Sequence, residues 1–153
     1  MTVRASRYHD ISCGHRVHGH ESKCRHLHGH NYRIHFTVEG KYSELDDLGR
    51  VMDFSVIKSR LCMWVEEFWD HRFLAWDEDP IMMAIRSNAV GMGGPEDEVL
   101  ADSIVWVPFN PTAENMGQYL LEVVGPRQLE GTGCKLVYVK IEETAKCSAE
   151  LSI

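Results

Sequence analysis

The stretch that most constrains the fold runs from residue 31 to residue 39, where polar and apolar residues alternate. The apolar positions are Tyr32, Ile34, Phe36 and Val38, and the polar ones include Asn31, Arg33, Thr37 and Glu39. Such alternation is typical of a strand with one buried face. His28 and His30 lie just upstream, and residues two apart on a strand share a face. If the strand continues back without a bulge, both histidines emerge on its core side.

Two imidazoles on a core face need a partner, and a metal ion is the usual one. His15 is the candidate third ligand. Three neutral imidazoles with an open fourth position form a Lewis-acid zinc site. The spacing does not choose the ligands, because five other histidines lie nearby: His9, His18, His20, His26 and His35. Cys24 as a fourth ligand would make the site structural, and the pattern favours catalytic and structural zinc equally.

Cys24 and the pair Asp70-His71 have residue types suited to acid–base chemistry. Beside a cation the thiol pKa of Cys24 would fall, giving a thiolate that acts as base or nucleophile. The alternatives are a zinc ligand or an inert thiol. Asp70 could orient His71 as a proton relay. The alternative for that pair is a capping and solvent-exposed role at a helix end.

Glu143 ends a predicted strand from Lys135, whose alternation places Val137, Val139 and Ile141 on the same face. A carboxylate that closes an apolar row is costly unless something binds it. It can accept two parallel N–H bonds from a flat amidine-like edge, as pterins and guanines offer. The alternative is an internal salt bridge.

The length of 153 residues indicates one domain, residues 1–153. The net charge of −7 argues against a nucleic-acid or anionic-membrane binder, although six Arg and Lys against two acids make residues 1–35 locally basic. That local charge suggests either an anion site or a solvated loop. Five cysteines without a secretory cue indicate reduced thiols in the cytoplasm. No stretch is apolar enough to span a membrane.

The pattern of the chain predicts an α+β fold with the order strand, strand, helix, helix, strand, strand. The expected strands are 2–13, 28–40, 135–143 and 147–151, and the expected helices run from an Asp53 or Ser55 N-cap to Trp69 and from a Thr112 N-cap to Gly125-Pro126. This order favours a four-stranded antiparallel sheet with two helices on one face. Between the helices we expect a short helix at 80–85, a mobile stretch from Ser87 to Asp97 and a short extra strand at 103–107.

Several motifs occur together in one order: Ile11-Ser12-Cys13-Gly14-His15, Cys24-x3-His28-Gly29-His30-Asn31-Tyr32, Gly49-Arg50-Val51-Met52-Asp53-Phe54, Asp70-His71, Pro111-Thr112-Ala113-Glu114-Asn115 and Glu143-Thr144. In this combination the chain resembles the 6-pyruvoyl-tetrahydropterin synthase / 6-carboxytetrahydropterin synthase family. The short gap between Cys24 and His28 is similar to the 6-carboxy branch, which serves queuosine synthesis.

The resemblance implies a T-fold whose sheets pair into a barrel, commonly as a homohexamer with sites between subunits. It implies zinc on His15, His28 and His30, Cys24 as proton acceptor, and His71 with Asp70 or Glu143 as the relay. It also implies that Glu143 anchors the pterin ring and that Thr112 and Glu114 line the pterin pocket.

The implied activity is that of a zinc-dependent lyase. It would convert 7,8-dihydroneopterin triphosphate to 6-carboxy-5,6,7,8-tetrahydropterin, acetaldehyde and triphosphate. The alternative within the family is 6-pyruvoyl-tetrahydropterin synthesis, which stops after triphosphate elimination. An alternative of another class is a non-catalytic, zinc-stabilised binding module.

Overall fold

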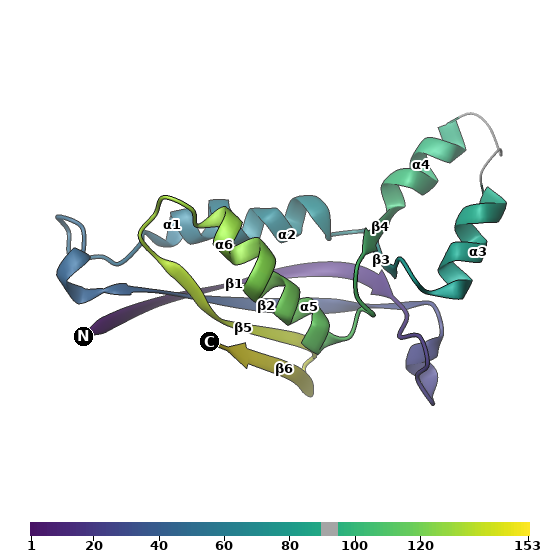
Figure 1. Cartoon of the computed structure of the whole chain (residues 1–153), viewed down its shortest axis with the longest axis horizontal. Coiled ribbons are helices and arrows are strands. Elements are labelled where there is room, and N and C mark those ends of the chain that lie inside the picture. Colours follow the sequence, from purple (N-terminus) through teal and green to yellow (C-terminus); the bar gives the residue numbers. More distant parts are fainter. Residues whose placement is uncertain (90–94) are drawn as a thin grey trace.

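The computed structural model describes residues 1–89 and 95–153, and it consists of one sheet with helices packed against it (Figure 1). Its strands are β1 (Thr2–His15), β2 (His28–Lys41), β3 (Phe73–Trp76), β4 (Ile104–Val107), β5 (Lys135–Thr144) and β6 (Cys147–Ser152). Its α-helices are α1 (Phe54–Ile57), α2 (Met63–Phe68), α3 (Pro80–Ala89), α4 (Pro95–Ser103), α5 (Ala113–Tyr119) and α6 (Gly125–Gln128). Short turns are η1 (Lys23–Arg25), η2 (Tyr42–Glu44), and the π-helical η3 (Lys58–Cys62) and η4 (Leu120–Val124).

The sheet of the described residues has six strands in the order β4-β3-β1-β2-β5-β6, so the expected four-stranded antiparallel sheet is too small. The four expected strands are present and pair antiparallel. The additional strands β3 and β4 are parallel to β1 and to each other. The sequence suggested β4, whereas a four-residue strand such as β3 is too short for alternation to reveal.

The β1–β2 hairpin is paired without interruption from Thr2↔Lys41 to His15↔His28. β1 therefore extends two residues beyond the predicted end at Cys13. Because no bulge interrupts β2 before Tyr32, the condition for His28 and His30 to lie on the core face is met. The one shift between β2 and β5 lies between Thr37 and Val38.

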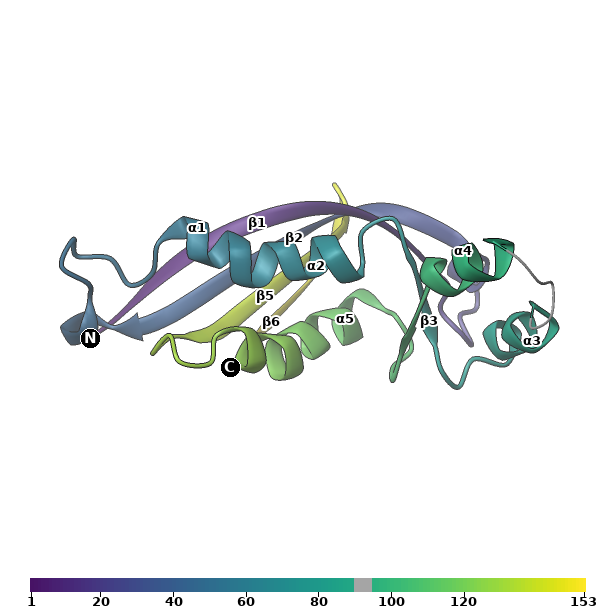
Figure 2. The same cartoon turned by 90° about the horizontal axis from the view of Figure 1, so that it is seen from above.

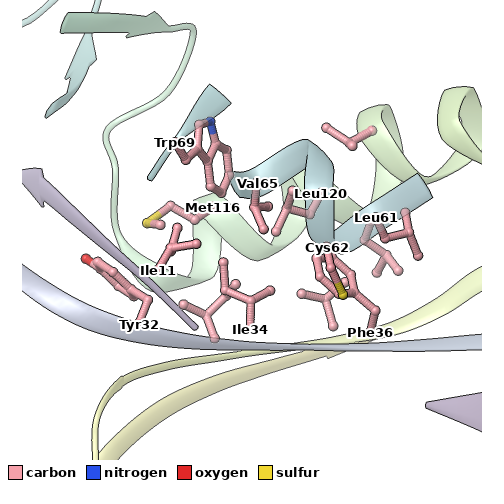
Figure 3. Packing of buried hydrophobic residues seen from close by; sticks show 14 of the residues in the cluster. Ile11, Tyr32, Ile34, Phe36, Leu61, Cys62, Val65, Trp69, Met116 and Leu120 are labelled. Atoms are coloured by element: carbon pink, nitrogen blue, oxygen red, sulfur yellow. The ribbon is translucent and has the colours of Figure 1, made fainter. Parts of the chain in front are cut away.

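Two helical segments cover one face of the sheet, as predicted (Figure 1). The first consists of α1, η3 and α2, and the second consists of α5, η4 and α6. Asp53 caps the first by accepting a bond from the Ser55 backbone N–H, and Thr112 caps the second through the Asn115 N–H. Figure 3 shows Ile34 and Phe36 of β2 packed against Val65 and Leu120 from the two helical segments. This apolar layer holds both helical segments against the sheet. It thereby fixes the position of the residues that come directly after each segment.

The predicted helix end at Gly125-Pro126 is wrong. After the π-helical turn η4, the chain continues into α6, and Pro126 lies in its first turn, where a missing N–H is tolerated. Gly125 itself is helical, with φ of −53°, rather than a left-handed cap. Its small size is required because α6 packs directly on β5.

Gly125→Ala tests that close packing. Alanine usually stabilises a helix relative to glycine by about 1 kcal/mol, but a Cβ here would lie 2.6 Å from Leu136 Cδ2 and 2.8 Å from Leu136 Cβ. We therefore expect the free energy of unfolding to fall by about 1–3 kcal/mol in urea denaturation. The control Gln118→Ala, at an exposed position of α5, should change it by less than about 0.5 kcal/mol. A more stable Gly125→Ala protein would contradict this packing.

α3 and α4 project from the end of the sheet that carries β3 and β4, as both views show (Figures 1 and 2). The predicted short helix at 80–85 is present as α3 and extends to Ala89. Of the predicted mobile stretch 87–97, residues 90–94 lie outside the described residues. No helix of the described ranges is long and apolar enough to cross a membrane.

Candidate active site

The end of the β1–β2 hairpin gathers His15, His28 and His30 on its core face. His15 pairs with His28 in the strand register, and Cys13 pairs with His30. The candidate ligand atoms of the three imidazoles all lie within 4.8 Å of one another. Among the described residues, the other five histidines of the N-terminal region do not belong to this group. His9 and His35 bind carboxylates, His18 contacts Arg16, and His20 and His26 lie in the loop between the strands.

Backbone carbonyls orient two of the imidazoles. His15 Nδ1 lies 2.6 Å from the Pro111 carbonyl oxygen, and His28 Nδ1 lies 2.7 Å from the His26 carbonyl oxygen. A carbonyl only accepts, so each Nδ1 carries the proton and each Nε2 presents a lone pair. The two Nε2 atoms are 3.1 Å apart. Two facing lone pairs cannot bond each other, but both can bind one cation.

His30 completes the donor set. Its Nε2 is buried and has no hydrogen-bond partner among the described residues, although Glu143 Oε1 lies 3.3 Å away. Burial lowers the pKa of His30, against the opposing effect of the Glu143 carboxylate, so the neutral ligand form is favoured. An orphaned buried nitrogen beside two converging lone pairs fits a zinc ion held by three imidazoles.

The burial of His15 makes the stability of the metal-free protein dependent on pH. Burial lowers the pKa of His15 from 6.5 to about 4, so between these values the unfolded chain binds a proton that the folded chain does not. The contribution of His15 to stability is therefore full above pH 6.5 and is lost on acidification, by about 3 kcal/mol when pH 4 is passed. Urea unfolding of the metal-free protein across this range measures it. An unchanged slope in His15→Gln would contradict the assignment to His15.

A cavity of about 260 Å³ brings together Cys24, Thr112, Glu114 and Glu143. Cys24 comes from η1 in the loop between β1 and β2, Thr112 and Glu114 from the start of α5, and Glu143 from the end of β5. Since Glu143 also approaches His30, it lies between this cavity and the three imidazoles. These residues, assigned to catalysis and substrate binding by family resemblance, are thus adjacent in space.

Asp70 and His71 line a different cavity, of about 700 Å³, together with Ser12 and Asn31. Asp70 Oδ2 lies 2.6 Å from His71 Nδ1, and Asp70 Oδ1 accepts the Ser12 N–H. His71 has a left-handed backbone with φ of 57° and a side chain that is 82% exposed. A single chain therefore forms the Asp70–His71 pair but does not place it in the Cys24 cavity.

Two features of the site were missed by sequence reasoning. The Tyr32 hydroxyl lies 3.3 Å from both ring nitrogens of His15, whereas the alternation identified Tyr32 only as an apolar core residue. Arg16 forms a buried ion pair with Asp79. The sequence offered one signal for the second feature, because an Asp directly before Pro80 is a typical helix start.

Comparison with known proteins supports the resemblance. The model of the family described as 6-pyruvoyl tetrahydropterin synthase matches residues 4–152. A protein of Rickettsia bellii named 6-carboxy-5,6,7,8-tetrahydropterin synthase is 31% identical over 150 residues, covering 97% of this chain and 99% of its own. A Halobacterium salinarum protein named probable 6-carboxy-5,6,7,8-tetrahydropterin synthase is 38% identical over 110 residues, covering 72% of this chain and 61% of its own.

Solved structures share the fold. An uncharacterized protein of Wolinella succinogenes superimposes with a TM-score of 0.84 at 26% identity, covering 99% of this chain and 98% of its own. The 6-pyruvoyl tetrahydropterin synthase of Caenorhabditis elegans superimposes with a TM-score of 0.65 at 23% identity, covering 100% of this chain and 96% of its own. The three-histidine group, the adjacent cavity and these matches lead to one conclusion: the chain is an enzyme that belongs to the 6-pyruvoyl tetrahydropterin synthase family.

Proposed function

We propose that the protein is a zinc-dependent 6-carboxytetrahydropterin synthase. The substrate would be 7,8-dihydroneopterin triphosphate, and with one water the products would be 6-carboxy-5,6,7,8-tetrahydropterin, acetaldehyde and triphosphate. One observation carries the proposal: a group of three imidazoles stands beside a cavity lined by a thiol and a carboxylate. The names of the curated relatives favour this product over 6-pyruvoyl-tetrahydropterin.

His15, His28 and His30 would hold the zinc, with the Pro111 and His26 carbonyls fixing two of the rings. When bound, the ion would polarise side-chain oxygens of the substrate and acidify the adjacent C–H and O–H bonds. Cys24 would take protons from these positions as a thiolate. The chain would thus divide charge stabilisation and proton transfer between neighbouring residues.

The pterin ring would bind in the same cavity. Glu143 would accept two N–H bonds from the flat amidine-like edge of the ring. Thr112 and Glu114, at the start of α5, would line the ring face. Because Glu143 also approaches His30, its carboxylate would couple ring position to the metal group.

The Asp70–His71 pair would act as the relay in an assembly of several copies. It lines a separate cavity in one chain, and a neighbouring copy would bring its pair to the Cys24 cavity. β4 and β6 form the two edges of the sheet and could pair with other copies, in agreement with the barrel and the homohexamer that the family resemblance implies.

The basic N-terminal region would offset the charge of the triphosphate, but only in part. Arg4, Arg16 and Arg33 already form ion pairs with carboxylates. Lys23 and Arg25 flank Cys24, and no carboxylate of the described residues lies within ion-pair distance of either. All five cysteines are free, which fits a reducing cytoplasm. The 6-carboxytetrahydropterin product would serve queuosine synthesis, as the family resemblance implies.

Product analysis tests the proposal. The zinc-loaded protein is incubated with 7,8-dihydroneopterin triphosphate, and pterins, acetaldehyde and triphosphate are quantified. We expect equal amounts of 6-carboxytetrahydropterin and acetaldehyde. Triphosphate with 6-pyruvoyl-tetrahydropterin and no acetaldehyde would indicate the alternative reaction. No turnover, combined with unfolding on chelation, would indicate a zinc-stabilised binding module.

A further inference from the structure

A buried ion pair joins α3 to the loop between β1 and β2, which contains Cys24. It lies outside the cavity that Cys24 lines. Arg16 Nε donates to Asp79 Oδ2 at 2.6 Å, and the side chains are only 7% and 1% exposed. Asp79 Oδ1 accepts the Ile81 N–H, and the Asp79 carbonyl accepts the Met83 N–H, so the carboxylate also caps α3. Asp79 is therefore fixed by the helix, and Arg16 is fixed by Asp79.

The remaining donors of the Arg16 guanidinium point into the loop between β1 and β2. Nη1 donates to the Arg25 carbonyl at 2.9 Å, and Nη2 lies 3.1 Å from His18 Nδ1. One residue away, the Val17 N–H donates to the Cys24 carbonyl at 2.8 Å. The carbonyl groups of two successive residues, Cys24 and Arg25, are thus held by the two residues that directly follow His15.

The same loop is tied to the start of α5. The His18 N–H donates to Asn110 Oδ1, and Asn110 Nδ2 donates to the His18 carbonyl. Asn110 is followed by Pro111, whose carbonyl orients His15, and by Thr112 of the cavity. The position of Cys24 relative to the imidazoles and the cavity therefore depends on one connected set of polar contacts, with Arg16 at its buried centre.

We propose that Arg16 and Asp79 are a positioning pair that holds Cys24 against the metal group and the cavity. Neither residue lines the cavity, so both act through the loop. The planar guanidinium serves three acceptors in fixed directions, and a lysine ammonium cannot reproduce that geometry. This inference rests on the proposed role of Cys24 and extends it to residues that do not touch substrate.

Arg16→Lys, in zinc-loaded protein, is the principal test, and Arg4→Lys is its matched control. Arg4 binds Glu39 at the far, exposed end of β1. Measurements are zinc content, kcat, KM and the pH profile of the alkylation rate of Cys24, followed by peptide mass spectrometry. We expect Arg16→Lys to lower kcat about 10–100-fold with little change in KM, because small misplacements of a reacting group have effects of that size. The alkylation profile should shift, and zinc content should stay unchanged. Arg4→Lys should match the wild type in every readout.

If Arg16→Lys does not fold, Asp79→Asn replaces it. The amide keeps one oxygen for the Ile81 N–H but cannot accept from Arg16 through its nitrogen. A wild-type kcat and alkylation profile in the folded variant would overturn the proposal, as would a loss of zinc that accounts for the whole loss of activity. Turnover retained by Cys24→Ala would instead reject the proposed function, while the alkylation profile of Arg16→Lys would still show whether the pair positions the loop.

Discussion

Cys24→Ala should lower turnover by about 10²–10⁴-fold while zinc content and the fold stay unchanged, the range typical of a lost acid–base group. The physical reason is position. Cys24 lines the cavity with Glu143. It does not belong to the group of potential metal ligands found among the described residues, which consists of the three imidazoles. Removing the thiol therefore removes a proton acceptor and leaves the zinc donors in place. Steady-state kinetics and metal analysis of the same preparation measure both effects.

The matched control for that variant is Cys134→Ala. Cys134 is another half-buried thiol, and its Sγ donates to the Val51 carbonyl at the opposite end of the sheet. We expect its turnover to stay near that of the wild type. Loss of zinc from Cys24→Ala would contradict the account, because it would identify the sulfur as a ligand of a structural site.

His28→Ala should nearly abolish both zinc binding and turnover. Loss of a group that merely orients a ligand costs about 10–100-fold in affinity or activity, so loss of the ligand should cost more than about 100-fold. His28 is the half-buried first residue of β2. Removal of its imidazole leaves the core residues of that strand in place. The folded variant should therefore be stable enough for metal analysis.

His35→Ala controls for the loss of a histidine from the same strand. His35 lies on the opposite face of β2, where its Nε2 contacts Glu142 Oε2 at 2.6 Å. Zinc content and turnover should be close to wild type in this variant. Equal losses in His35→Ala and His28→Ala would show that the strand, rather than the imidazole group, controls the metal.

The sequence predicted those parts of the fold that repeat with a regular period. The alternation of Tyr32, Ile34 and Phe36 revealed β2 and the face of His28 and His30. The caps Asp53 and Thr112 revealed the helix starts. Short strands such as β3 have too few residues for a period, and Gly125-Pro126 marks a change of helix type and a close contact rather than an end.

In the candidate site, too, some features can be predicted from local sequence patterns and others cannot. The face shared by His28 and His30 follows from strand geometry, whereas the predicted first strand ended at Cys13, and only the structure extends it so that His15 pairs with His28. Contacts between distant segments do not follow from any local pattern. The Pro111 carbonyl on His15 and the Arg16–Asp79 pair join residues far apart in the chain, and only the folded structure shows them. The separation of Asp70-His71 from the Cys24 cavity belongs to the same class.

X-ray absorption at the zinc edge of the metal-loaded protein tests the central claim most directly, because it reports which atoms bind the ion. We predict three nitrogen neighbours at about 2.0–2.1 Å and one oxygen, with no sulfur. A sulfur neighbour at about 2.3 Å would place Cys24 on the metal and would contradict a site with an open position for substrate.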